Sequence, residues 1–378
     1  MVDAPPDRFE AFSAAAAQED AILAIEPERI VYALEGELIP QVAAPVLPAT
    51  ASASLPLDFL MGYREGVNDV VDKVLAAAGL PSPSVQGGAA PATLNESVLT
   101  WGLQATRVSE SRFTGKGIRI AVLDTGFDPG HPDFVGRTVV SRSFVPNETV
   151  QDGHGHGTHC IGTACGPRQP GQLPRYGVAY DAEIYVGKVL SNRGSGSDSG
   201  ILAGIEWAIA NRCAVVSMSL GAATVVGQSF SQVFERAARR ALANGTLIVA
   251  AAGNDSQRPS TITPVSHPAN CPSILAVGAL DSGLRVASFS NGGVNLSGGQ
   301  VDIAGPGVAV RSSWPRPTLY RTISGTSMAT PHVAGIAALH AEANPDMRGA
   351  TLGWLLLQSA LRLPLITRDV GSGLVQAP

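Results

Sequence analysis

Continuous apolar runs alternate with helical patterns through most of this chain, and this alternation limits the folds that it can adopt. The apolar runs occupy 118–123, 214–218, 246–252 and 274–280, and helical periods occupy 199–211, 229–243 and 326–342. A strand that is apolar on both sides must be covered on both faces, as in parallel sheets whose crossovers are helices. The pattern therefore predicts an α/β fold: a three-layer, doubly wound, mostly parallel sheet with helices on both faces.

The first 95 residues have a different texture. The segment 29–34 predicts a strand, and 54–79 predicts a helix because its apolar residues recur at steps of three and four before Gly79. Stretches rich in Ala, Pro, Ser and Gly flank that helix and are typical of linkers. We therefore expect a smaller N-terminal α+β region, 1–95, ahead of a main domain, 96–378.

Composition excludes some classes of partner. The 378-residue chain has a net charge of −5 and no run of Lys or Arg, so we expect no binding to nucleic acid. We expect no membrane partner either, because no apolar stretch approaches the length of a membrane span. The first residues, MVDAPPDRFE, carry acids and prolines where a secretory signal has basic residues and an apolar block. This favours a cytoplasmic location, or secretion if an earlier targeting segment has been removed.

The four cysteines, at positions 160, 165, 213 and 271, match no metal-binding spacing. The simplest interpretation is that they are small buried side chains kept reduced. A disulfide is left open, because pairing cannot be read from a sequence.

Two segments place reactive residue types at the ends of expected elements. VLDTG (122–126) puts Asp124 at the end of a buried strand, where α/β folds gather working groups, although such an Asp is commonly a turn former. SGTSMATPHVAG (324–335) delivers Ser327 to the first turn of a helix. The free N–H groups there favour a developing oxyanion, although a Ser at this place is commonly a cap.

A third segment, DGHGHGTHC (152–160), contains three histidines. The pattern His-x-His-x-x-His resembles the zinc-binding run of metallo-hydrolases. That run usually has an Asp before its last His, but Thr158 stands there, and no further ligands follow at suitable places. We therefore favour a catalytic histidine over a metal site.

Asp124, His156 and Ser327 follow one another in the chain order of subtilisin's catalytic triad. With the strings TWGL (100–103) and GSGLV (371–375), these motifs make the main domain similar to the subtilase family, subtilisin and proteinase K type. The resemblance implies that Ser327 attacks the scissile carbonyl, His156 removes its proton, and Asp124 orients His156. The imidazole would then lie within hydrogen-bonding reach of both the hydroxyl and the carboxylate.

The resemblance also assigns the other two histidines of that segment and the residues around the substrate. His159 would pack internally and His154 would lie at the rim. Asn254, in VAAAGND (249–255), matches the family's oxyanion asparagine. Ile262 aligns with the floor of the primary pocket, which would take small or medium apolar side chains. The residues that would clamp an extended peptide by backbone pairing are Gly194, Ser195, Gly196, Ser219, Leu220 and Gly221.

Position 198 departs from the family pattern. Asp198 stands where relatives often have an aromatic residue, so the outer pocket would tolerate polar or basic groups.

The chemistry implied by the resemblance needs no cofactor, but a structural calcium ion is expected. Asp302 matches a family calcium ligand, and the carbonyls of Pro272 and Ile274 would complete the site. Residues 1–95 stand where subtilases carry an inhibitory, fold-assisting prosegment, and EPER (26–29) resembles the end of one. The chain's own N-terminal region is thus a candidate intramolecular inhibitor.

The sequence predicts a serine endopeptidase that hydrolyses protein or peptide substrates through an acyl-enzyme. A peptide-tailoring subtilase, leader-removing or macrocyclising, is an alternative, in which an amine instead of water can release the acyl group. A degenerate binding module that keeps the fold is a second alternative, against which the complete set of Asp124, His156, Ser327 and Asn254 argues.

Overall fold

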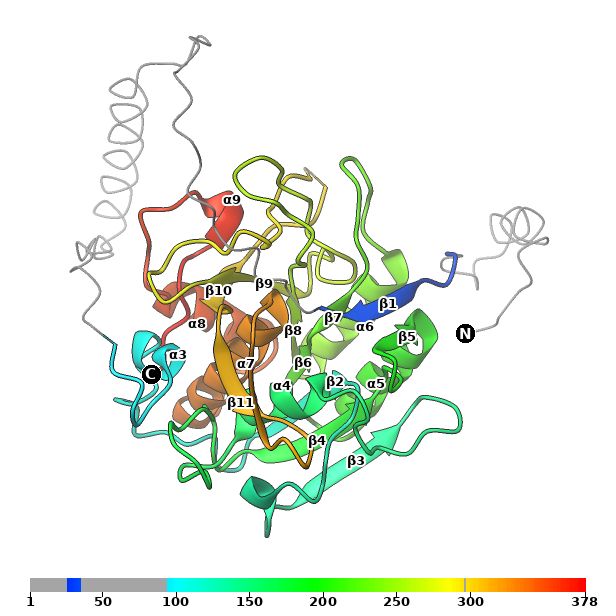
Figure 1. Ribbon diagram of the computed structural model, residues 1–378. Coiled ribbons are helices and arrows are strands. Elements are labelled where there is room, and N and C mark those ends of the chain that lie inside the picture. Colours follow the sequence, from blue (N-terminus) through cyan, green and yellow to red (C-terminus); the bar gives the residue numbers. More distant parts are fainter. Residues whose placement is uncertain (1–25, 35–93, 296) are drawn as a thin grey trace. The chain divides into compact units, whose positions relative to one another are not determined.

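The computed structural model of this chain describes residues 26–34, 94–295 and 297–378 (Figure 1). These residues belong to one compact unit. The helix expected over 54–79 lies outside the described residues, and the boundary expected at residue 95 stays a prediction.

A seven-stranded sheet forms the core, with the strand order β10-β9-β8-β6-β2-β4-β3 and parallel pairing throughout. The first strand of this sheet in the sequence is β2. The next two strands, β3 and β4, lie on one side of β2, and the later strands, β6, β8, β9 and β10, lie on the other side. The winding therefore reverses at β2, which confirms the doubly wound topology. The strands are β2 (Arg119–Asp124), β3 (Val139–Ser143), β4 (Glu183–Lys188), β6 (Val215–Met218), β8 (Leu247–Ala251), β9 (Leu275–Leu280) and β10 (Ile303–Pro306).

Helices cover both faces of this sheet, as the continuous apolar strands predicted. Successive side chains of β2 show the two layers: Ile120 and Val122 belong to one apolar cluster, and Ala121 and Leu123 belong to the other. The first cluster includes residues of α4 (His156–Cys165), α7 (Thr326–Ala343) and α8 (Ala350–Ser359), and the second includes residues of α5 (Asp198–Ala210) and α6 (Gln232–Ala243). Figure 1 shows these helices on the two sides of the sheet.

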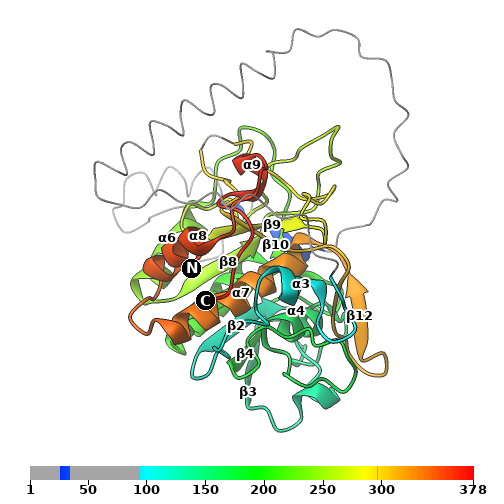
Figure 2. The ribbon, with the colours of Figure 1, turned by 90° about the vertical axis from the view of Figure 1, so that its left-hand side faces the viewer.

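Helix α7 is buried along nearly its whole length. Figures 1 and 2 show it against the sheet, with α4 beside it. Small residues are required for such close packing: a Cβ added at Gly335 would come within 2.7 Å of the Val178 side chain. Because α7 is held on all sides, residues at its first turn have a fixed position relative to the strand ends.

Smaller elements surround the main sheet. β1 (Ile30–Ala33) lies between β5 (Ser195–Ser197) and β7 (Leu220–Gly221) in an antiparallel three-stranded sheet. The other elements are the hairpin β11 (Val310–Ser313) and β12 (Tyr320–Ile323), the short helices α3 (Trp101–Ala105) and α9 (Thr367–Val370), and the 3-10 helix η2 (Pro132–Phe134). Within the described part of the chain, no helix has both the length and the apolar character needed to cross a membrane.

Replacing Ile120 by Ala should lower the free energy of unfolding by about 2–5 kcal/mol, because this fully buried β2 side chain leaves a cavity in a close-packed layer. Urea unfolding followed by tryptophan fluorescence measures the change, in a Ser327→Ala background that prevents self-digestion. Val140→Ala, at a partly exposed position of edge strand β3, is the control and should change stability by less than about 0.5 kcal/mol. Equal losses at the two positions would contradict this description of the core.

Candidate active site

The carboxyl ends of neighbouring strands bring the three sequence motifs together. Asp124 is the last residue of β2, and Asn254 follows β8. His156 is the first residue of α4, and Ser327 lies in the first turn of α7. This is the edge at which doubly wound sheets place their functional groups.

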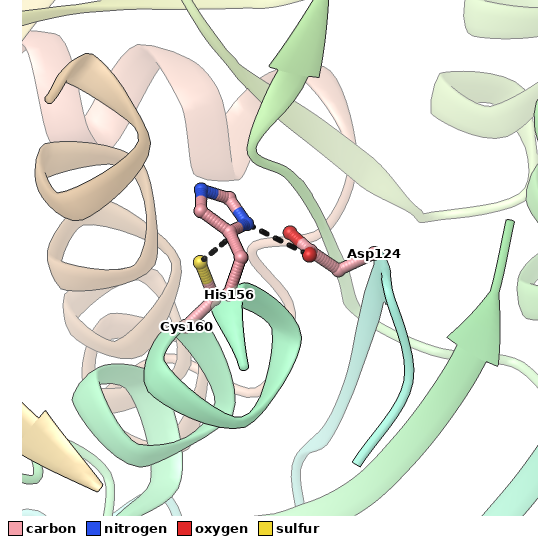
Figure 3. Close-up of side chains that lie close together, drawn as sticks. All are labelled: Asp124, His156 and Cys160. Atoms are coloured by element: carbon pink, nitrogen blue, oxygen red, sulfur yellow. Dashed lines mark hydrogen bonds and ion pairs between the residues drawn. The ribbon is translucent and has the colours of Figure 1, made fainter. Parts of the chain in front are cut away.

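Asp124 and His156 form a buried hydrogen bond. His156 Nδ1 lies 2.8 Å from Asp124 Oδ1, and the two side chains are 0% and 1% exposed. The carboxylate can only accept, so Nδ1 carries a proton, and in the neutral ring Nε2 has a free lone pair. Figure 3 shows the ring turned with one nitrogen toward Asp124. Nε2 has no hydrogen-bond partner among the described residues, so it is available as a base.

The environment of His156 favours its charged form. Burial alone would lower the pKa of His156, but the negative charge of Asp124 and the hydrogen bond to it outweigh burial. The pKa is therefore raised well above the usual 6.5. An imidazolium formed during a reaction is stabilised here, which is the role of the carboxylate in a triad.

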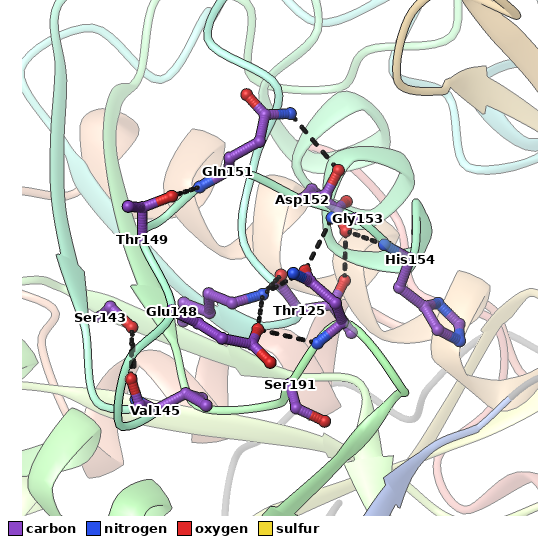
Figure 4. Close-up of polar contacts among 12 residues, drawn as sticks. Thr125, Ser143, Val145, Glu148, Thr149, Gln151, Asp152, Gly153, His154 and Ser191 are labelled. Carbon is purple, nitrogen blue, oxygen red and sulfur yellow. Dashed lines mark hydrogen bonds and ion pairs between the residues drawn. The ribbon is translucent and has the colours of Figure 1, made fainter.

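Asp152 holds the loop that leads into α4. Its carboxylate accepts hydrogen bonds from Thr125 Oγ1 at 2.9 Å, Gly155 N at 2.7 Å and Thr158 N at 2.9 Å. Figure 4 shows Asp152 between Thr125 and the residues before the helix. One carboxylate thus ties the turn after Asp124 to the start of the helix that carries His156.

Lys188 also contacts the turn after Asp124. Its fully buried Nζ donates to Thr125 O at 2.5 Å and to Asn192 Oδ1 at 2.9 Å, and it pairs with Glu148 at 3.2 Å. A buried ammonium with these partners fixes the backbone next to Asp124.

Ser327 is connected to Ser219 in two ways. The Ser327 hydroxyl donates to Ser219 O at 3.1 Å, and the Ser219 hydroxyl donates to Ser327 O at 2.8 Å. The expected contact between the Ser327 hydroxyl and His156 is therefore not the one made here. A rotation of the hydroxyl about the Cα–Cβ bond is needed to redirect it.

Cys160 lies between the histidine and the serine segment. Its Sγ is 3.8 Å from His156 Nδ1 (Figure 3). The same Sγ is 3.6 Å from Ser327 O. The thiol is buried, and burial raises its pKa, so it stays neutral. All four cysteines are buried and free, as the sequence suggested.

Asn254 presents an unpaired donor. Its Oδ1 accepts from Thr326 N and Thr326 Oγ1, each at 2.9 Å, which fixes the orientation of the amide. Nδ2 is buried without a partner in the described residues, as expected of a group that binds a developing oxyanion. The preceding Gly253 has φ +109°, and a Cβ there would overlap Ser266.

The chain's own segment 26–34 lies beside these groups, because Leu34 N bonds the same Ser219 carbonyl that accepts from the Ser327 hydroxyl. β1 pairs with β5 through Val31 and Gly196 and with β7 through Ala33 and Leu220. The flanking backbone adds two bonds, from Ala33 N to Gly194 O at 2.9 Å and from Leu34 N to Ser219 O at 3.4 Å. The structure thus brings both predicted peptide-binding segments to the two sides of one extended strand.

Side chains of this strand alternate between protein and solvent. Val31 is fully buried in an apolar cluster, whereas Tyr32 is 54% exposed. Leu34 lies beside Gly221, where a Cβ would come within 3.2 Å of Leu34 Cδ1 and 3.3 Å of the Ser266 side chain. Leu34 and Ser266 therefore border the same space.

Ile262, expected at the floor of that space, lies elsewhere. Its Cγ2 is the neighbour of Gly292, close to Arg258. Ser266 is the residue that sequence reasoning missed. Its only sequence signal is its place directly before His267-Pro268, ahead of β9.

The three clustered histidines do not converge on a metal. His159 Nε2 faces two carbonyl oxygens, of Val310 at 3.1 Å and Arg321 at 3.2 Å, and burial lowers its pKa to about 3. His154 is directed toward Gly194. Within the described residues, the one group spaced to hold an ion is Asp124, His156 and Cys160, and there His156 Nδ1 already donates to the carboxylate.

The expected calcium ligand Asp302 is largely buried. Its Oδ2 accepts from Ala276 N at 2.7 Å, and burial raises its pKa to about 6. The half-buried Asp133, by contrast, accepts hydrogen bonds on both carboxylate oxygens, from Tyr176, Tyr320 and Gly171 N. Asp302 therefore has the greater need of a cation.

Comparisons with known proteins agree with this geometry. The model of the subtilase family matches residues 115–373. Subtilisin E of Bacillus subtilis (strain 168) is 41% identical over 250 residues, which are 66% of this chain and 61% of that protein. M-protease of Shouchella clausii (strain KSM-K16) is 38% identical over 367 residues, 96% of this chain and 85% of that protein.

Solved structures show the same similarity. A cold-adapted subtilisin-like serine proteinase matches with a TM-score of 0.63 and 34% identity, over 75% of this chain and 99% of the other. Sphericase matches with a TM-score of 0.64 and 33% identity, over 74% of this chain and 98% of the other.

Asp124→Asn should reduce kcat by about 10⁴- to 10⁵-fold, a range that includes the loss when subtilisin itself is deprived of its triad aspartate. Loss of the negative charge lowers the pKa of His156, and the base acts only when its imidazole is neutral. The acid limb of the pH profile of kcat/KM should therefore move to lower pH in the variant. Asp281→Asn, which changes an exposed ion pair with Arg285, is the control. An unchanged acid limb in Asp124→Asn would contradict the assignment.

Proposed function

This chain belongs to the subtilase family, and on that premise we propose that it is a serine endopeptidase. The observation that carries the proposal is the buried Asp124–His156 pair. Its Nε2 has no partner among the described residues, and Ser327 lies at the same carboxyl end of the sheet. Because the match spans only 61% of subtilisin E, the activity is inferred from the site as well as from the family.

The reaction begins when Ser327 Oγ attacks the substrate carbonyl and its proton moves to His156 Nε2. The resulting oxyanion accepts hydrogen bonds from Asn254 Nδ2 and Ser327 N, and Asp124 stabilises the imidazolium. His156 then returns the proton to the leaving amine, which leaves an acyl group on Ser327. Water activated by the same histidine hydrolyses this acyl-enzyme.

The substrate is a protein or peptide bound as an extended strand between β5 and β7. The pairing seen for Ile30–Ala33 supports this, because main-chain hydrogen bonds give affinity that does not depend on sequence. Side-chain selection comes from the space beside Leu34 and from the apolar pocket that encloses Val31. Both favour small or medium apolar side chains.

The N-terminal region acts as an intramolecular inhibitor in this proposal. Glu26 accepts hydrogen bonds from Ser231 Oγ and Gln232 N, each at 2.6 Å, at the start of α6. Glu28 accepts from the N–H and hydroxyl of Ser199 at the start of α5, which lowers its pKa. Two carboxylates at two helix N-termini are electrostatically favourable anchors for the segment.

Cleavage after Leu34 follows from the register. Ser219 O accepts from both the Ser327 hydroxyl and Leu34 N, so the same carbonyl contacts the nucleophile and the last described residue of the segment. Leu34 is therefore the residue whose carbonyl is attacked.

The intact mass of the full chain tests both parts of this proposal. The wild type should give fragments 1–34 and 35–378, whereas Ser327→Ala should remain whole and should not react with a fluorophosphonate. Ser282→Ala, at an exposed turn, is the matched control and should be cut like the wild type. Equal cutting of Ser327→Ala would refute the nucleophile. Cutting at another bond would refute the register, and joined products would favour a macrocyclising enzyme.

We also propose a structural calcium ion at Asp302, with the carbonyls of Pro272 and Ile274. The side chain of Asp302 fits such an ion, because it is a buried carboxylate that accepts one hydrogen bond, from Ala276 N, among the described residues. Hard oxygen ligands of this kind suit Ca²⁺. The ion would stabilise the fold and take no part in the chemistry.

Calcium should raise the Tm of the Ser327→Ala chain by about 5 °C over EDTA when its concentration is ~100 times Kd. Calorimetry with and without CaCl₂ measures this shift. Asp302→Asn should lose it, and Asp281→Asn should keep it. A shift of equal size in Asp302→Asn would place the calcium elsewhere.

A further inference from the structure

A buried carboxylate lies at the rim of the cleft, beyond the residues that pair as β1. Asp198 is the first residue of α5, and its side chain is 10% exposed. Its Oδ1 lies 3.0 Å from His267 Nε2. Its Oδ2 accepts from Arg29 N at 3.2 Å and from Arg29 Nη1 at 3.3 Å.

His267 fixes the position of this carboxylate but does not have to neutralise it. The imidazole is 3% exposed and packs edge-on against Phe234 with ring centroids 4.6 Å apart. An ionised carboxylate can only accept, so His267 Nε2 is the donor of this hydrogen bond. A nearly buried carboxylate needs a cation nearby, and the Arg29 guanidinium provides it.

The register of β1 decides which residue can reach Asp198. Asp198 N donates to Arg29 O at 3.2 Å, so Asp198 continues the backbone pairing of Ile30 with Ser197. Arg29 stands five residues before Leu34 in the chain. A peptide bound in the same register therefore places its residue at that position against Asp198, whatever the sequence between them.

We propose that Asp198, held by His267, forms a subsite that selects an arginine or lysine five residues before the residue at the cleaved bond. This proposal rests on the protease function proposed above and names a substrate class for it: extended peptides with an apolar strand preceded by a basic residue. In the bound segment, Glu26 lies 3.4 Å from Arg29 Nη1 and shares the cation. A substrate without that glutamate depends on Asp198 alone.

Peptides that differ only in charge test the subsite. Two fluorogenic peptides have the sequence of residues 27–37, which leaves out Glu26, one with Arg at position 29 and one with citrulline, which keeps the shape but not the charge. The full-length enzyme, after self-cleavage and dilution, should cleave the Arg peptide with about tenfold higher kcat/KM. Asp198→Asn should reduce this ratio to within twofold. Glu206→Gln, on the same helix but paired with Arg240, should keep it.

A second measurement does not need activity. In the uncut Ser327→Ala chain, hydrogen exchange of the amides of residues 30–34 should speed up about tenfold in Arg29→Gln and in Asp198→Asn. The double variant should exchange no faster than either single variant, because both remove one interaction.

The two measurements separate this proposal from the protease function. A wild type that cleaves both peptides within twofold, or exchange effects that add in the double variant, would overturn the subsite. A chain that cleaves neither peptide nor casein, yet shows the non-additive exchange, would refute the protease function and support the binding site.

Discussion

The burial of α7 along nearly its whole length is the constraint on which the site depends. A helix packed against the sheet and α4 has to be built from small residues, and its buried polar side chains need hydrogen-bond partners, several of which are carbonyls of the helix itself. Thr330 Oγ1 donates to Thr326 O at 2.9 Å, and His332 Nδ1 lies 2.8 Å from Met328 O. The nucleophile thus stands on an element that cannot shift without disturbing the core. The apolar packing around α7 therefore also fixes the position of the Ser327 side chain.

Much of the fold was predictable because the buried strands and helices have strong patterns. The runs at 118–123 and 274–280 became β2 and β9, and the period at 229–243 became α6. Edge strand β3 was missed because its residues are mostly outside the core and alternate weakly. β10, with the sequence IAGP, was missed because Gly and Pro are typical of turns rather than strands.

The site shows the same division. Asp124, His156, Ser327 and Asn254 could be found because each lies in a long motif at the end of an apolar strand or the start of a helix. Ser266 could not, because its importance comes from a neighbouring glycine that is distant in the chain. The hydroxyl's preference for Ser219 O over the imidazole is likewise a matter of local rotamer, which no motif records.

The position of Leu34 beside Ser219 has a consequence for how occupancy of the cleft is controlled. While the bond at which we propose self-cleavage, after Leu34, is intact, the segment is tethered to the protein, and its effective concentration between β5 and β7 is set by the connecting chain. Once that bond is cut, residues 26–34 become a separate ligand whose binding follows mass action. Before cleavage, inhibition by residues 26–34 does not depend on protein concentration. After cleavage of one bond, dilution weakens this inhibition. At high protein concentration the cut segment would stay bound between β5 and β7, and at low concentration it would dissociate.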